Sequence, residues 1–139
     1  MALSANKFDN YKPSKFRKAF PCLTNIVFYR GALLMIDANG YLTIGADTAS
    51  CSCAGVALSD LDMTGISSGA KSLEVDCGGC EVKVTQSDGS MTQANVGDSC
   101  VVNGDDAVKA SGNVPAGRVS EIVDADTVWV KLYGFGTIS

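Results

Sequence analysis

The sequence contains no histidine among its 139 residues. Histidine is the usual general base, the usual partner of a catalytic nucleophile and the commonest metal ligand, so the simplest designs for an enzyme or a metal site are missing. Long apolar runs are also missing. The longest run, Ala32–Ile36, is far shorter than the roughly 20 residues that span a bilayer. We therefore expect a chain that is not an enzyme, binds no cofactor and does not enter a membrane.

Apolar residues make up 46% of the chain and charged residues 19%. A disordered chain is poorer in apolar residues and richer in charge, so this composition favours a folded domain. Fifteen glycines separate short runs rich in valine and isoleucine, which favours β structure. No segment of the predicted body has a sustained helical period. The expected fold class is all-β, a small antiparallel β-sandwich or barrel with an extended N-terminal arm.

The charges are distributed unevenly along the chain. Residues 1–21 hold five basic residues and one acidic residue, whereas residues 22–139 hold six basic and fourteen acidic residues. The sequence therefore predicts a basic, aromatic arm over 1–21 and a β-domain over 22–139. Such an arm is typical of segments that bind an anionic partner outside their own fold, although a solvated tail is the alternative. Because the body is acidic, no direct binding of nucleic acid is expected.

The arm interleaves aromatic and basic side chains, which predicts docking onto a surface. Pro13 also permits a short helical turn at Ser14–Ala19. The residues predicted to make the contact are Phe8, Tyr11, Lys12, Lys15, Phe16, Arg17, Lys18 and Phe20.

Short alternating segments separated by turn residues predict strands in the body. Asn39-Gly40 predicts a hairpin between Ala32–Ile36 and Tyr41–Ile44. Gly78-Gly79 predicts a second tight hairpin, between Ser72–Asp76 and Glu81–Thr85, with the alternation placing Glu74 and Asp76 on a solvated face. Further strands are expected at Asn25–Arg30, Gly55–Leu58, Ser99–Asn103, Ala107–Ala110, Gly117–Val123 and Thr127–Tyr133. The glycines Gly134 and Gly136 predict a loose C-terminal tail.

Six cysteines leave several interpretations open, among them a Cys77–Cys80 disulfide formed in a released particle. Cys51, Cys53, Cys77 and Cys80 together resemble a four-thiolate zinc site, although the Cys-x-Cys half has an unusual spacing. Cys77 and Cys80 alone have the spacing of a thiol oxidoreductase, but the βαβ context of such enzymes is missing. The purely structural interpretation is that the cysteines are small apolar core residues without a metal. The N-terminal residues do not resemble a secretory signal, so we expect synthesis in a cytoplasm, where disulfides rarely form.

Short motifs between residues 29 and 133 resemble those of tailed-phage capsid cement (head decoration) proteins. These motifs are turn-and-strand patterns rather than a catalytic fingerprint. They are Tyr29-Arg30-Gly31-Ala32, Asp37-Ala38-Asn39-Gly40, Gly55-Val56-Ala57-Leu58, Val96-Gly97-Asp98, Asn103-Gly104-Asp105-Asp106-Ala107-Val108, Ala116-Gly117-Arg118-Val119 and Val128-Trp129-Val130-Lys131-Leu132.

The resemblance implies a β-rich structural protein that binds the outer surface of a phage head and stabilises contacts between major capsid subunits. It implies the major capsid protein as partner, a homo-oligomer (a dimer or trimer), and a location on the capsid exterior of the virion after synthesis in the host cytoplasm. A zinc-stabilised β module of another assembly is the alternative, followed by a small thiol oxidoreductase. The arm residues are the ones expected to reach a capsid subunit.

Overall fold

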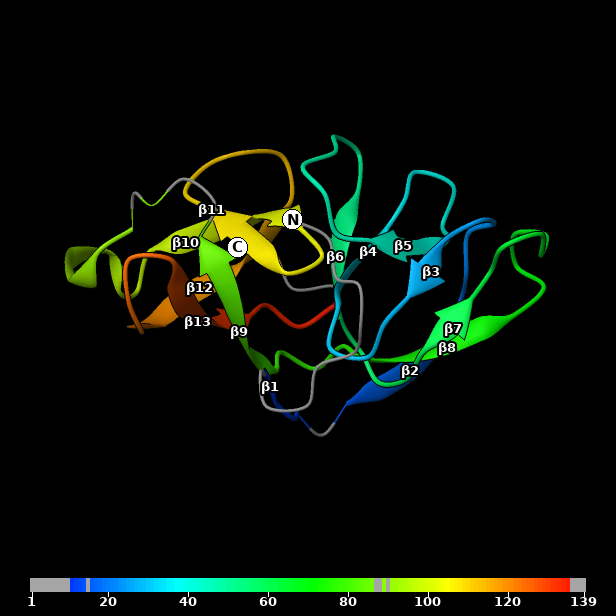
Figure 1. Ribbon diagram of the computed structural model, residues 1–139, viewed down its shortest axis with the longest axis horizontal. Helices are drawn as coiled ribbons and strands as arrows, with labels where there is room; N and C mark the ends of the chain where they lie inside the picture. The colour runs from blue at the N-terminus through cyan, green and yellow to red at the C-terminus, as the bar shows by residue number, and fades with distance from the viewer. Residues whose placement is uncertain (1–10, 15, 87–88, 90, 136–139) are drawn as a thin grey trace.

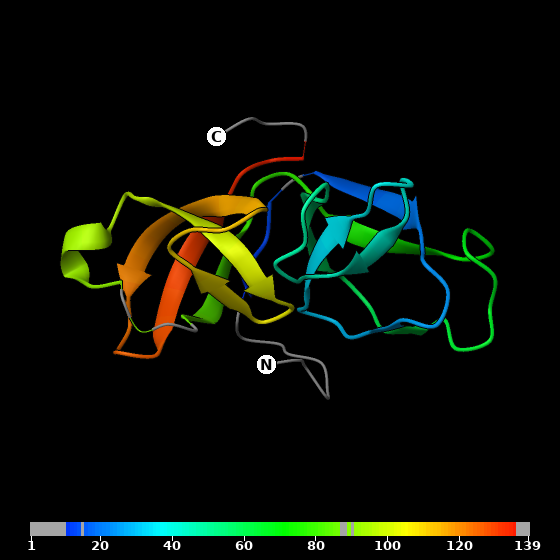
Figure 2. The same ribbon diagram turned by 90° about the horizontal axis from the view of Figure 1, so that it is seen from above.

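Short strands alternate with turns along the whole described chain, and the all-β class is confirmed. The computed structural model describes residues 11–14, 16–86, 89 and 91–135. These residues form two β lobes that lie side by side along the long axis (Figures 1 and 2). No helix in the described residues is long and apolar enough to cross a membrane.

The first lobe is a closed barrel of five strands. These are β9 (Glu81–Gln86), β10 (Ser99–Gly104), β11 (Ala107–Lys109), β12 (Pro115–Ile122) and β13 (Thr127–Leu132). The barrel closes because β9 pairs in parallel with β11 on one side and antiparallel with β13 on the other. The short strand β1 (Tyr11–Lys12) lies beside the start of β9, and a single 3-10 turn, η1 (Gln93–Asn95), precedes β10.

The second lobe is a five-stranded sheet with the order β2-β8-β6-β4-β5. Its strands are β2 (Arg17–Pro21), β4 (Leu33–Ile36), β5 (Leu42–Ile44), β6 (Ser52–Ala57) and β8 (Ser72–Asp76). The sheet curls so that Cys22, just after β2, forms a bridge with Leu42 of β5. A separate pair, β3 (Val27–Phe28) and β7 (Leu61–Asp62), completes this lobe.

Strand β4 is buried on both faces, because each lobe packs its core against one of them. Leu33 and Met35 belong to the core of the first lobe, whereas Leu34 belongs to that of the second. The neighbouring strand β6 divides its side chains similarly, with Val56 in the first core and Ala54 in the second. The two cores are therefore joined through shared strands.

The hairpin predicted at Asn39-Gly40 is confirmed, with Met35 paired to Thr43. The hairpin predicted at Gly78-Gly79 is wrong. Strand β8 pairs with β2 and β6 in the second lobe, whereas β9 belongs to the barrel of the first. The alternation on both sides of the glycines was correct, but residues 77–80 carry the chain from one lobe to the other.

The N-terminal segment also differs from the expected arm. Arg17–Pro21 is a strand that pairs with β8 along its length, not a helical turn. Tyr11–Lys12 pairs with the first lobe. The boundary expected at Pro21 therefore lies inside a continuous structure, because Arg17–Pro21 pairs with β8 although its sequence does not alternate.

The shared strands predict that both lobes unfold together. Leu33→Ala and Leu34→Ala remove side chains from opposite cores, and each should cost about 3 kcal/mol, as buried leucine truncations typically do. Each variant should lower the denaturant midpoint seen by Trp129 fluorescence in the first lobe and by hydrogen exchange of β8 amides in the second. Separate transitions of the two probes in either variant would contradict the shared core.

Candidate docking surface at the lobe junction

In the described part of the chain, three stretches lie where it passes between the lobes, namely 13–14 with Phe16, 77–80 and 133–135, and backbone hydrogen bonds join them. The Cys77 N–H donates to the Phe16 carbonyl at 3.0 Å, and the Phe135 N–H donates to the Cys77 carbonyl at 2.8 Å. The three crossings therefore form one connected unit, visible between the lobes in Figure 2.

Asp76, the last residue of β8, has no exposed surface. Its carboxylate accepts hydrogen bonds from the Tyr11 hydroxyl and the Ser14 N–H, both at 2.8 Å, and from the Ser14 hydroxyl. A weaker contact of 3.4 Å comes from the Gly78 N–H. The carboxylate thus attaches residues 11–14 to the end of β8. The sequence placed Glu74 and Asp76 on a solvated face, and residues 11–14 cover Asp76, whereas Glu74 stays exposed.

The backbone around Asp76 is packed closely on its other side. At Gly55 of β6, φ is +142°, and a Cβ would lie 2.0 Å from the Asp76 carbonyl oxygen. Only glycine permits this approach of β6 to the end of β8.

The hydrogen bonds decide the charge state of Asp76. Burial alone opposes ionisation, but the bonds from Ser14, Tyr11 and Gly78 outweigh it and hold the pKa of Asp76 below its ordinary value. Burial, together with the bond to Asp76, raises the pKa of Tyr11. Near neutral pH, the Asp76 carboxyl group is therefore ionised and the Tyr11 hydroxyl group is protonated.

Some of the residues predicted to contact a partner are used inside the protein. Tyr11 bonds to Asp76, and the Phe20 ring is buried in the second core. The Lys12 ammonium lies 3.4 Å from Glu81 and 4.7 Å from the centre of the Trp129 ring. Tyr11 and Phe20 hold the N-terminal segment to the two lobes, whereas the Lys12 side chain is 62% exposed and its ion pair carries little energetic weight.

Phe16, Arg17 and Lys18 instead face outward. Phe16 is 66% exposed, the highest value among the exposed large hydrophobic side chains. Arg17 lies 3.9 Å from Glu74 with both side chains about half exposed, a pair of little energetic weight. Phe8 and Lys15 lie outside the described residues.

Phe135 joins this surface from the far end of the chain. Its ring meets Phe20 edge-on at 5.2 Å, yet Phe135 remains 44% exposed. The sequence predicted a loose tail here, whereas Phe135 is docked. The only local signal was an aromatic residue between two glycines. We define the junction strip as Phe16, Arg17, Lys18 and Phe135, with the side chains of Arg17 and Lys18 on opposite faces of β2.

The structure does not bring the four candidate zinc thiols together. Cys77 lies in the core of the second lobe, whereas Cys80 lies in that of the first, with Cys51 and Cys53 packed against it. Among the described residues, no group of three or more histidine, cysteine, aspartate or glutamate side chains is placed to hold a metal ion. All six cysteines are free thiols, and nothing in their placement favours the zinc or oxidoreductase alternatives.

Burial governs the thiols. It raises the pKa of Cys22 to about 11 and those of Cys53 and Cys100 to about 12, and it also raises the pKa values of Cys77 and Cys80. A thiol is nucleophilic as the thiolate, so these groups are unreactive near neutral pH.

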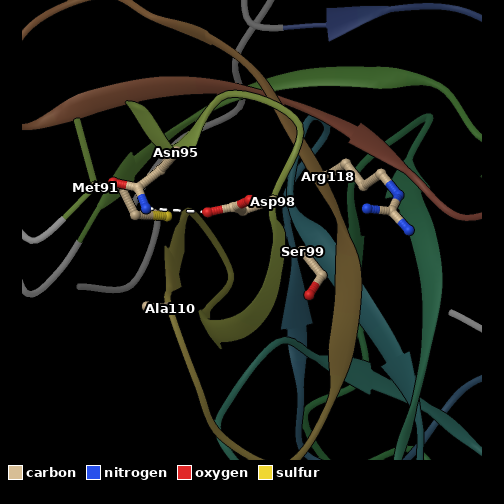
Figure 3. Close-up of a pocket in the computed structure, with 6 residues that line it drawn as sticks. All are labelled: Met91, Asn95, Asp98, Ser99, Ala110 and Arg118. Carbon is tan, nitrogen blue, oxygen red and sulfur yellow. Dashed lines mark hydrogen bonds between the residues drawn. The ribbon is translucent and has the colours of Figure 1, made fainter. Parts of the chain in front are cut away.

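A hollow of about 380 Å³ lies on the first lobe, between η1 and the barrel. Figure 3 shows its lining, in which the Asn95 amide donates to Asp98 at 3.1 Å. The Arg118 guanidinium donates to the Gly97 carbonyl at 2.9 Å. Because these polar groups already bond to one another, the hollow is a weaker candidate than the junction strip.

Comparison with protein-family models, with curated proteins and with solved structures finds no match for this chain.

Asp76→Asn tests the carboxylate at the junction. The substitution removes the charge and presents an amide N–H₂ to donors, so stability at pH 7 should fall by about 3 kcal/mol, the scale for hydrogen bonds to a buried charged group. The pKa of Asp76 is lower in the folded protein than in the unfolded chain. The contribution of the ionised carboxylate to the free energy of unfolding is therefore complete above the unfolded pKa of ~3.9, and it is lost as the pH falls through the folded pKa.

Urea unfolding of both proteins from pH 7 to pH 2 measures this difference. The difference in free energy of unfolding between Asp76→Asn and the unmodified protein should narrow on acidification. Asp62→Asn is the matched control, because the exposed Asp62 accepts only a local bond from Thr64, and its loss should be much smaller. A constant gap across this range would contradict the assigned role of the charge.

The cysteines give a second test. Cys80→Ala should destabilise the protein by about 1 kcal/mol, because a small core residue loses little volume. A strong chelator should leave the melting temperature of the unmodified protein unchanged. Native Cys22, Cys53 and Cys100 should react with a thiol reagent at pH 7.5 only on unfolding, as judged by mass spectrometry. A chelator-induced drop in melting temperature would instead favour the zinc module.

Proposed function

We propose that this chain is a capsid cement protein that binds the outer surface of a phage head and stabilises contacts between major capsid subunits. The short motifs between residues 29 and 133 resemble that family. The observation that carries the proposal is the junction strip, where Phe16 is 66% exposed beside Arg17 and Lys18.

The chemistry of the junction strip suits the surface of another protein. Aromatic and arginine side chains are enriched in protein interfaces and dominate their binding energy. Phe16 and Phe135 supply apolar area, Lys18 supplies charge on the same side of β2 as Phe16, and Arg17 supplies charge on the opposite face of the strand. Because the Asp76 bonds hold the crossing segments in place, little conformational freedom is lost when a partner binds.

A small, rigid β protein is suited to cementing a shell. The shell repeats the same seam many times, and each bound copy adds contact area across one seam. A dimer or trimer of the chain would engage several subunits at once, and linked contacts raise the overall affinity beyond that of each contact. This proposal assigns no catalytic step and no cofactor to the chain.

Phe16→Ala tests the proposal. Heads of the phage that encodes this chain, assembled without it, are mixed with purified protein, and bound protein is measured after sedimentation. The unmodified protein should bind, and Phe16→Ala should bind at least about tenfold more weakly, the loss typical of a central aromatic contact.

Val123→Ala is the matched control, because Val123 is also exposed, at 46%, but lies at the turn between β12 and β13. It should bind like the unmodified protein. Failure of the unmodified protein to bind heads would overturn the proposed function. If Phe16→Ala and Val123→Ala bind heads equally well, the junction strip does not contact the head.

A further inference from the structure

Strand β2 has one backbone edge that is unpaired in the described part of the chain. In antiparallel pairing, alternate residues direct their N–H and C=O groups toward the partner. The Phe16 carbonyl accepts from Cys77, and the Cys22 N–H donates to Lys71. The residues of even number in this stretch therefore face β8, and Arg17, Ala19 and Pro21 direct their backbone groups to the opposite side.

The opposite backbone edge is paired only beyond Pro21, the last residue of β2. There the Leu23 N–H donates to the Leu42 carbonyl, and Cys22 forms its bridge to β5. Along β2 itself, β8 is the single paired strand among the described residues. The N–H groups of Arg17 and Ala19 and the carbonyls of Arg17, Ala19 and Pro21 thus form a short open edge, and these three residues are exposed.

The sequence of this edge disfavours a second copy of β2 as its occupant. Two copies paired antiparallel about Ala19 would gather both pairs of Arg17 and Lys18 into one ribbon. Pro21 has no N–H and would leave the Arg17 carbonyl of the other copy without a donor. Basic residues and proline are common devices against edge-to-edge pairing of like strands. The charge favours a partner that is acidic.

The paired edge of β2 shows which kind of strand this sequence accepts. Strand β8 alternates apolar Leu73 and Val75 with acidic Glu74 and Asp76. Asp76 lies opposite Arg17 in the register, and Glu74 lies 3.9 Å from the Arg17 guanidinium.

We propose that the open edge of β2, Arg17–Pro21, accepts an extended acidic segment of a partner protein as an added strand. Its backbone bonds to Arg17 and Ala19, its acidic side chains lie beside Arg17, and its apolar side chains pack near Phe16. Identifying that partner as a capsid subunit rests on the proposed function. The preference of the edge for an acidic strand rests only on the residues of β2 and β8.

A peptide titration tests the edge without phage heads. The probe is the capped peptide Ser-Leu-Glu-Val-Asp, the sequence of β8, and the control peptide carries lysine at both acidic positions. Amide chemical shifts of the ¹⁵N-labelled protein are followed up to millimolar peptide. The largest shifts should fall on Arg17 and Ala19, and the control should bind at least tenfold more weakly. No shift, equal binding of both peptides, or larger shifts at Lys18 and Phe20 would overturn the proposal.

Variants at Ala19 connect the edge to head binding. Ala19→Pro removes the outward N–H and leaves the bonds to β8, because proline is tolerated on edge strands. Ala19→Val keeps the N–H. Ala19→Pro should weaken head binding at least tenfold, and Ala19→Val should stay within about twofold of the unmodified protein. Circular dichroism and melting check the fold, and if Ala19→Pro does not fold, the peptide titration of the unmodified protein decides.

The outcomes separate the two proposals. If the unmodified protein binds heads and Ala19→Pro binds equally well, the edge proposal fails and the cement proposal stands. If the unmodified protein does not bind heads, the cement proposal fails, and the peptide titration still judges the edge. A dimer in analytical ultracentrifugation that Ala19→Pro abolishes would overturn the acidic partner in favour of a second copy.

Discussion

Asp76 keeps its carboxylate charge with no exposed surface, and such a charge is stable inside a protein only when donors surround it. Here the donors come from the N-terminal segment, through Tyr11 and Ser14. Asp76 ends the last strand of the second lobe, and Tyr11 is paired with the first lobe. The same bonds therefore stabilise the charge, attach the N-terminal segment and join the lobes. The junction strip begins two residues after Ser14, so its position follows from this contact.

The two cores are not independent, because β4 and β6 give side chains to both. A strand buried on both faces cannot move with one lobe without disturbing the other. The junction strip is therefore built on a constrained part of the molecule, although it exposes Phe16 and Phe135 to solvent. Exposed aromatic side chains on a rigid base suit recognition, because the surface is already ordered in the free protein and loses little conformational entropy on binding.

The Cys-x-x-Cys motif illustrates how a crossing changes the meaning of a local pattern. In a hairpin, Cys77 and Cys80 would lie close together, as a metal site or a redox pair requires. In this fold the two glycines between them carry the chain between lobes, and each thiol enters a different core. Burial then raises their pKa values and removes thiolate character.

The sequence alone determined the all-β class, most strand positions and the hairpin at Asn39-Gly40, because alternation and turn residues act over a few neighbouring residues. It also marked Phe16, Arg17 and Lys18 as candidates for an outer surface. Alternation sets which side chains share a face of a strand, but not which strand lies alongside or what covers that face. The separation of β8 from β9 and the burial of Asp76 were decided only by tertiary structure, because the donors to Asp76 lie 62 and 65 residues away in the chain.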